Sequence, residues 1–272
     1  MSWPGPACTD RHGLAGFRAL LTGCLAQLLA GCATVPPPAP DSFLPLAADA
    51  RVWHEAGGEA YAGEAAALLD DAIARVEAVH GLPFLRPPRL LVCHTPACYR
   101  RLMPVAAYTA VVLPGERLLL SPKLELEERE RLPGILAHEL SHLHLAQRLG
   151  HYTTALPVWF HEGLASLAGE GGGAEFSSDE EACGAWDAGR RIDFTRLDSP
   201  GKRHRAADFK LSIHQFYRQS WRFMAYLRRR APAAFAALLS QVQAGKDLTA
   251  AVANAYNADL ERLSLEFDFD SR

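Results

Sequence analysis

The sequence of 272 residues lacks a strong excess of either charge. It has 28 Lys and Arg against 31 Asp and Glu, a formal net charge of −3 at pH 7. Proteins that bind nucleic acid usually present a basic surface. The basic run from Lys202 to Arg205 is short and typical of a solvated loop. We therefore expect no nucleic-acid partner.

The sequence also lacks an apolar run of the length that spans a membrane, about 20 residues. The apolar stretch from Ala19 to Gly31 is too short, and it follows Arg11 and Arg18. A basic start, a short apolar stretch and a small-residue end are typical of an export signal. We predict that residues 1–31 are such a signal, and the lack of a longer run excludes a membrane-embedded enzyme.

The end of this stretch, Leu29-Ala30-Gly31-Cys32, resembles the signal of bacterial lipoproteins, which is cleaved before a Cys that is then acylated. This resemblance implies a lipid anchor at Cys32. Ala33, rather than Asp, follows, which implies retention at the outer membrane, facing the periplasm. The alternative is an ordinary cleavage site beside an incidental Cys. The Pro-rich residues 32–50 are predicted to form a stiff tether, and residues 51–272 one folded domain.

Cysteine is scarce. Of the six Cys residues, export and lipidation would account for the first three, leaving Cys93, Cys98 and Cys183. These are too few for a zinc ribbon, which needs two pairs. The four residues between Cys93 and Cys98 suit a small disulfide loop in an oxidising compartment. We predict this disulfide; the alternative is two unpaired buried thiols.

The clearest chemical signal is the segment His138-Glu139-Leu140-Ser141-His142. Residues four apart lie one turn apart on the same face of a helix, so the two imidazoles can reach one metal ion. His138 and His142 are therefore predicted zinc ligands. Glu139, one position round the helix, would lie beside the metal and take a proton from bound water.

A second segment, Pro157 to Ala165, follows 20 residues later and contains a His-Glu pair. Catalytic zinc usually has a third protein ligand and one open position, and Glu162 is the candidate. The histidines of the first motif could instead be solvated on a surface helix. Apolar residues at helical spacing favour a buried helix, whose imidazoles need a partner such as a metal: Ile135, Leu136, Leu140 and Leu143.

Together, His138-Glu-Leu-Ser-His142 and Trp159-Phe-His-Glu162-Gly-Leu-Ala165 resemble the gluzincin metallopeptidases, the group of thermolysin and aminopeptidase N. In that group two His and a distal Glu hold zinc. The resemblance implies a zincin-like fold, one Zn²⁺ per chain, and peptide-bond hydrolysis by Glu-assisted attack of zinc-bound water. The tail, from Tyr217 to Leu227 and again at Gly245 to Thr249, resembles the peptidase MA-like domain of bacterial envelope proteins.

The chain departs from this group at one informative position. The thermolysin branch carries an Asp four residues after the ligand Glu, where this sequence has Ser166. An outer carboxylate of this kind usually orients a ligand His. The group that orients His142 is therefore left open.

The periodicity of apolar residues predicts an α+β fold with two lobes. A small mixed sheet with helices forms the upper lobe, and its last strand, Arg117–Ser121, lies at the edge of the cleft, where it could pair with an extended peptide. The lower lobe is mainly helical.

Pro133 is read as either the start of the zinc helix or a kink in it. Residues 185–210 are either a loop near the cleft or core packing around Trp186 and Phe194. The expected segments are helices at 58–80, 96–103, 158–168, 211–230, 232–244 and 248–267, a zinc helix that includes 135–143, and strands at 89–94, 107–113 and 117–121.

During hydrolysis, negative charge develops on the carbonyl oxygen of the substrate, and a neutral hydrogen-bond donor nearby helps to stabilise that charge. Tyr217 lies early in an expected helix and matches the Tyr of the MA-like pattern. His214 and His204 are rival donors, and Tyr217 could instead only pack beside the apolar stripe of its helix.

These features predict a monomeric, membrane-anchored periplasmic zinc peptidase acting on a peptide or protein. The alternative is a zinc-bearing scaffold of the envelope that binds peptide or glycan without cleaving it.

Overall fold

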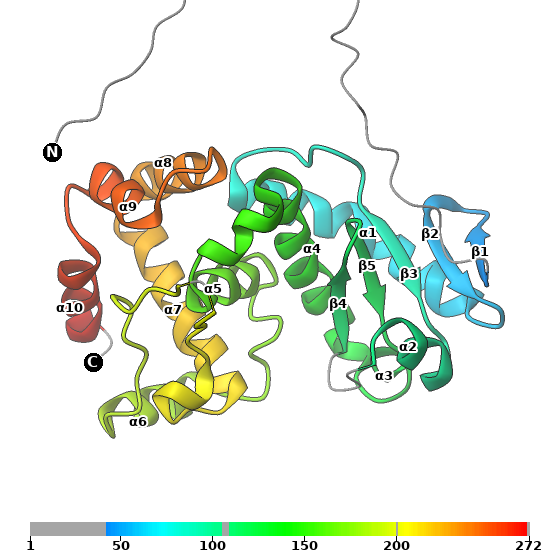
Figure 1. Cartoon of the computed structure of the whole chain (residues 1–272). Helices are drawn as coiled ribbons and strands as arrows, with labels where there is room; N and C mark the ends of the chain where they lie inside the picture. Colours follow the sequence, from blue (N-terminus) through cyan, green and yellow to red (C-terminus); the bar gives the residue numbers. More distant parts are fainter. Residues whose placement is uncertain (1–41, 105–108, 200, 271–272) are drawn as a thin grey trace, which may run out of the picture. The chain divides into compact units, whose positions relative to one another are not determined.

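The computed structural model describes residues 42–104, 109–199 and 201–270. The predicted signal, Cys32 and most of the predicted tether lie outside these residues. The described chain is of the mixed α+β class, with ten α-helices and a five-stranded sheet (Figure 1). No helix in the described chain combines the length and the apolar character needed to cross a membrane.

The sheet consists of β1 (Phe43–Leu46), β2 (Asp49–Glu55), β3 (Arg89–Val92), β4 (Ala110–Leu113) and β5 (Arg117–Leu120), in the order β1-β2-β3-β5-β4. The central strands β2, β3 and β5 run parallel, whereas β1 and β4 pair antiparallel at the two edges. The sheet is therefore mixed, as the sequence predicted.

Two expectations about the sheet were wrong. A strand, β1, lies at Phe43–Leu46, before the expected start of the folded domain near Arg51, and it pairs with β2. Its sequence contains Pro45, which is tolerated only in an edge strand and hid the strand from the periodicity. The strand at the edge is β4 rather than β5, because β5 inserts between β3 and β4.

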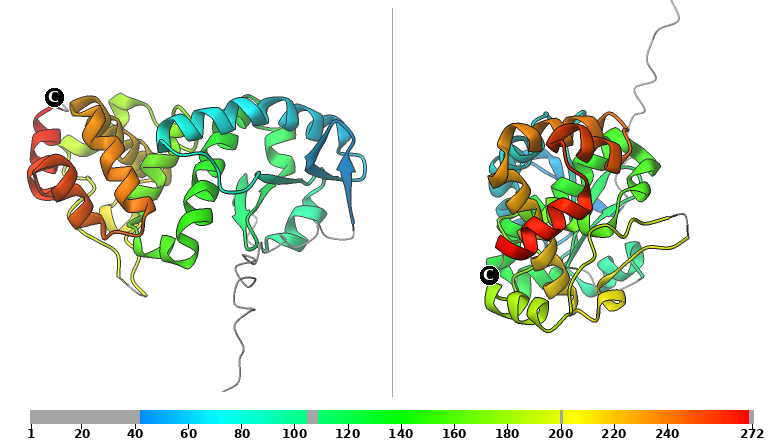
Figure 2. Two further views of the ribbon diagram at one scale, coloured as in Figure 1. Left: turned by 90° about the horizontal axis from the view of Figure 1, so that it is seen from above. Right: turned by 90° about the vertical axis from the view of Figure 1, so that its left-hand side faces the viewer.

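Helix α1 (Glu59–His80) packs on the sheet and on α4 (Leu132–Leu149) to form the first hydrophobic core. Its buried face includes Leu69, Ala72 and Val76. The helix ends at Gly81, whose φ of 73° is left-handed and suits glycine. In Figures 1 and 2 the sheet and α1 lie on one side of α4, and the later helices lie on the other.

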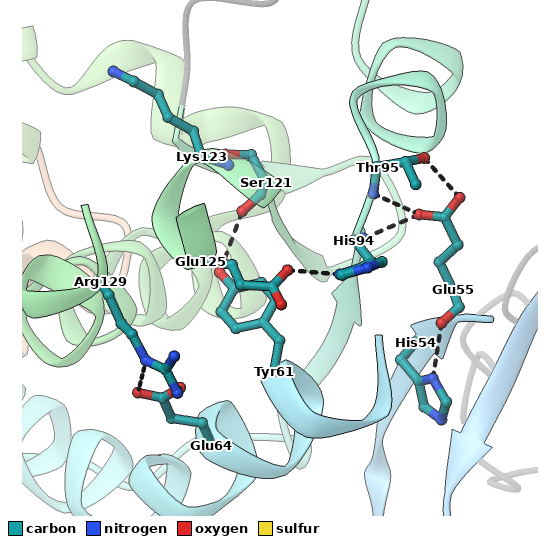
Figure 3. Close-up of polar contacts among 10 residues, drawn as sticks. All are labelled: His54, Glu55, Tyr61, Glu64, His94, Thr95, Ser121, Lys123, Glu125 and Arg129. Carbon is teal, nitrogen blue, oxygen red and sulfur yellow. Dashed lines mark hydrogen bonds and ion pairs between the residues drawn. The ribbon is translucent and has the colours of Figure 1, made fainter. Parts of the chain in front are cut away.

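A disulfide joins Cys93 and Cys98 beneath the short helix α2 (Pro96–Leu102). The Thr95 side chain caps this helix by accepting from the Cys98 amide. Glu55, at the end of β2, accepts from the amides of His94 and Thr95, and the His94 ring contacts Glu125 at 2.8 Å (Figure 3). These contacts fix the ends of the parallel strands.

The second core is built by α5 (Val158–Ala168), α6 (Asp179–Asp187), α7 (Ile213–Arg230), α8 (Pro232–Gln243), α9 (Leu248–Tyr256) and α10 (Leu260–Asp270). Trp186 and Phe194 are buried in it, and Phe194 stacks on Phe223 with ring centroids 3.9 Å apart. Core packing, rather than a loop, is therefore the outcome for this part of residues 185–210.

The single helix expected at 248–267 is instead two helices, α9 and α10. Asn257 breaks it with a left-handed φ of 50°, a conformation that Asn tolerates better than most residues. Asp259 then accepts a hydrogen bond from the Arg262 amide and starts α10. Apolar periodicity continues across the break, so it concealed this turn.

Candidate metal centre

Helix α4 places two imidazoles side by side. Pro133 lies in its first turn, where a missing N–H costs nothing, so this proline starts the helix and does not kink it. The buried side of α4 packs in the first core through Leu136, Leu140 and Leu143. His138 and His142 lie on the other side of the helix, with their Nε2 atoms 3.2 Å apart.

Helix α5 brings a carboxylate to the same point. It starts after Pro157, and Trp159 and Phe160 anchor it in the second core. Glu162 Oε2 lies 3.3 Å from His138 Nε2 and 3.6 Å from His142 Nε2. The two helices thus form a triangle of one oxygen and two nitrogens.

This triangle fits a small divalent cation. Bonds of about 2.0–2.1 Å to a tetrahedral ion place ligand atoms about 3.3 Å apart, and the three separations here are 3.2, 3.3 and 3.6 Å. Glu162 Oε2 is also buried without a well-formed hydrogen bond from the described residues. A buried carboxylate oxygen in that position needs a cation. His138, His142 and Glu162 therefore form a group that could hold a metal ion.

One other set of close N, O and S atoms in the described residues is Glu55 with Cys93 and Cys98. The two thiols are joined in the disulfide, and the Glu55 carboxylate accepts hydrogen bonds from residues 94 and 95. These groups are already committed to the fold, so we do not regard them as a metal site.

A glycine-rich loop after α5 orients the first imidazole. The Gly172 carbonyl, which can only accept, lies 2.8 Å from His138 Nδ1. The Nδ1 atom must therefore carry the proton, which leaves the Nε2 lone pair facing the triangle. The loop reaches this position because a Cβ on Gly172 would collide with the backbone of Gly134, and one on Gly173 would lie 2.8 Å from His138 Cε1. The glycine run is not among the residues that the sequence predicts for the site.

Among the described residues, Ser166 does not supply the orienting contact for His142 that an Asp provides in the thermolysin branch. Ser166, at the position of the thermolysin-branch Asp, is buried and its hydroxyl has no hydrogen-bond partner among the described residues. His161 lies near His142, with ring centroids 6.0 Å apart, but donates from Nε2 to the Thr153 carbonyl at 2.6 Å. His161 therefore points away from the triangle.

Charge and burial act on the ionisable groups of the centre. Burial raises the pKa of Glu139, although the imidazoles of His142 and His138 oppose the shift. Burial also disfavours the ionised form of Glu162 and so acts to raise its pKa. The imidazoles of His142 and His138 have the larger, opposite effect, and they hold the pKa of Glu162 well below its usual range. Burial, together with the charge of His142, lowers the pKa of His161 to about 4.

The three candidate donors lie in different surroundings. The Tyr217 ring, on α7, stacks on the His138 ring with centroids 5.9 Å apart. His214 donates from Nδ1 to the Gly173 carbonyl at 2.8 Å, so its neutral form has no second N–H to offer. His204 packs near Phe209, and its amide donates to Asp198. The structure thus places Tyr217 and His214 at the centre. Among the residues that the structure describes, no contact joins His204 to the centre.

In comparisons with known proteins, no protein-family model matches this chain, and no curated protein matches it either.

Proposed function

We propose that this protein is a zinc-dependent peptidase of the gluzincin type, in which His138, His142 and Glu162 hold one zinc ion. The observation that carries the proposal is the triangle of ligand atoms, with sides that suit tetrahedral zinc and with a half-buried glutamate, Glu139, beside it. The mixed sheet and helical second core are compatible with a zincin-like fold.

A zinc ion in this position supplies Lewis acidity, which makes water more acidic and polarises a carbonyl group. Glu139 takes a proton from the attacking water as its oxygen bonds to the peptide carbon. The same carboxyl then gives that proton to the amine as the C–N bond breaks, so Glu139 ends in its starting state. Tyr217 donates its O–H to the carbonyl oxygen, on which negative charge develops.

The edge strand β4 supports a peptide as the substrate. Within the described chain it pairs only with β5, and α4 packs against it. An extended peptide can add to such an edge through its main chain, independently of most side chains. The pairing role predicted for residues 117–121 therefore falls to β4.

We further propose that the protein is a monomeric lipoprotein of the bacterial outer membrane. Acylation at Cys32 and a Pro-rich tether after it would hold the domain in the periplasm, where a disulfide such as Cys93–Cys98 is stable. The proposal rests on the lipoprotein-like segment before Cys32.

Metal analysis and one substitution test the function. The purified chain should contain one zinc per molecule and cleave peptides in a mixed substrate pool, read by mass spectrometry. Glu139→Gln should keep the zinc and lower turnover about 10²–10⁴-fold. A chain with no bound zinc would refute the proposal. Zinc with no cleavage, and ligand binding that survives Glu139→Gln, would instead indicate the envelope scaffold.

A further inference from the structure

Arg131 holds the loop between α5 and α6 from outside the metal centre. Arg131 has a buried side chain, and its Nη2 lies 3.0 Å from Glu175 Oε2. Its guanidinium also lies over the ring of Phe176, 4.5 Å from the centroid. A cation is attracted to the face of an aromatic ring, so Arg131 fixes the position of the Phe176 ring.

A histidine holds the same ring from another direction. Phe176 packs edge-to-face with His214, with ring centroids 4.8 Å apart. His214 is itself fixed by its hydrogen bond to the Gly173 carbonyl. The ring thus has a defined position beside residues of the metal centre.

Despite these contacts, Phe176 is 59% exposed, and Ile213, next to His214, is 60% exposed. We call Phe176 and Ile213 the apolar rim. Exposed large apolar side chains held beside a functional site typically mark a ligand contact. Single exposed apolar residues are common, but Phe176 is held in place by both Arg131 and His214, and Ile213 is the residue before His214, so this pair is more informative.

The apolar rim lies within reach of a bound peptide. Gly173 packs against both His138 and Tyr217, and Phe176 follows it by three residues. Three residues span at most about 11 Å, the same length as three residues of an extended peptide. A peptide whose scissile bond lies at the metal centre could therefore place a nearby side chain on Phe176.

We propose that the apolar rim receives a large apolar side chain of a peptide bound at the metal centre, and that Phe176 is a specificity-determining residue. The substrate class is then peptides with Phe, Leu or a similar residue within a few positions of the cleaved bond. The cleavage part of this inference rests on the proposed function, whereas the binding part does not.

Binding is measured first, in the full chain carrying Glu139→Gln and loaded with zinc. The probes are fluorescent eight-residue alanine peptides with a single Phe moved through each position. We expect at least one Phe peptide to bind about tenfold or more tightly than the all-Ala peptide, as one apolar contact allows. Adding Phe176→Ala should reduce this preference to within about twofold, and Phe176→Leu should retain part of it.

Leu265→Ala is the matched control, because Leu265 is 66% exposed on α10; it should leave the preference unchanged. Equal zinc content in all variants shows that Phe176→Ala has not disturbed the centre. A Phe preference that survives Phe176→Ala, or no preference at all, overturns the inference. Cleavage of the same peptides by the wild-type chain tests the proposed function separately: binding preference without cleavage sinks the peptidase and leaves the inference standing.

Discussion

His161 and Glu162 are adjacent on α5, yet their side chains have different partners. Glu162 Oε2 completes the triangle with the two imidazoles of α4, whereas His161 Nε2 donates to the Thr153 carbonyl. Successive residues point about 100° apart around a helix, so only one of the two can face α4. The candidate ligands are therefore two His and one Glu, rather than three His.

We expect Glu162→Ala to weaken zinc binding more than about 100-fold, since even outer partners of a ligand contribute about 10–100-fold. His161→Ala should weaken it far less, because its imidazole is committed to the Thr153 carbonyl. Competition with a chromophoric chelator measures both affinities. The reverse order would identify a three-histidine centre and refute the gluzincin assignment.

Tyr217→Phe removes the candidate donor and keeps the ring that stacks on His138. Loss of one such donor costs about 10²–10³ in kcat, and we expect a loss of that size with unchanged zinc content and stability. The kcat is measured on a peptide that the wild-type chain cleaves. Near-normal turnover would contradict the assignment and direct attention to His214, which donates to Gly173 in the structure.

The contact between α5 and α7 determines where Glu162 lies. Gly163 lies at this contact, where an added Cβ would lie 2.6 Å from the Ser220 carbonyl and 2.7 Å from Met224 Cγ. Glycine therefore lets the two helices approach closely, and α7 carries Tyr217. One helix contact thus positions both Glu162, a candidate metal ligand, and the candidate donor.

Gly163→Ala should destabilise the fold, because overpacking costs about 1–3 kcal/mol and outweighs the gain in helix propensity. Gly63→Ala is the matched control: Gly63 lies within α1, and an added Cβ meets no atom within 4 Å. That change should stabilise the chain by about 0.5–1 kcal/mol. Urea unfolding of the metal-free chain compares the two, and equal effects would contradict the close contact.

At the scale of the whole molecule, the centre depends on both hydrophobic cores. Helix α4 contributes residues to both of them, and α5 belongs mainly to the second. The three residues of the triangle thus come from elements that different cores stabilise, and the loop after α5 supplies the carbonyl for His138. A bound ion would tie these parts together, so zinc should also raise the stability of the fold.

Cys32→Ser should release the protein from the membrane fraction or leave the signal uncleaved, since acyl chains are strong anchors when more than one is attached. Fractionation of cells followed by immunoblotting measures this, and Cys183→Ser is the control that should stay bound. Wild-type protein found soluble in the periplasm with an unmodified Cys32 would refute the anchor.

Local patterns in the sequence were enough for several features. Four-residue spacing placed His138 and His142 on one face of a helix. The helices expected at 58–80 and 96–103 agree with α1 and α2 to within one residue at each end. These features depend on neighbours within one or two turns, where helix geometry and capping rules apply directly.

Other features were decided only by the tertiary structure. The insertion of β5 between β3 and β4, the turn at Asn257 and the carbonyl of Gly172 on His138 all depend on segments that meet in space. The backbone of Gly134 admits the loop only because Gly172 has no side chain. By itself the sequence determined a helix that carries His138 and His142 on one face with a glutamate beside them. The packing of α5 and its loop on that helix decided how the three groups of the triangle are arranged, because long-range contacts leave no periodic pattern in a chain.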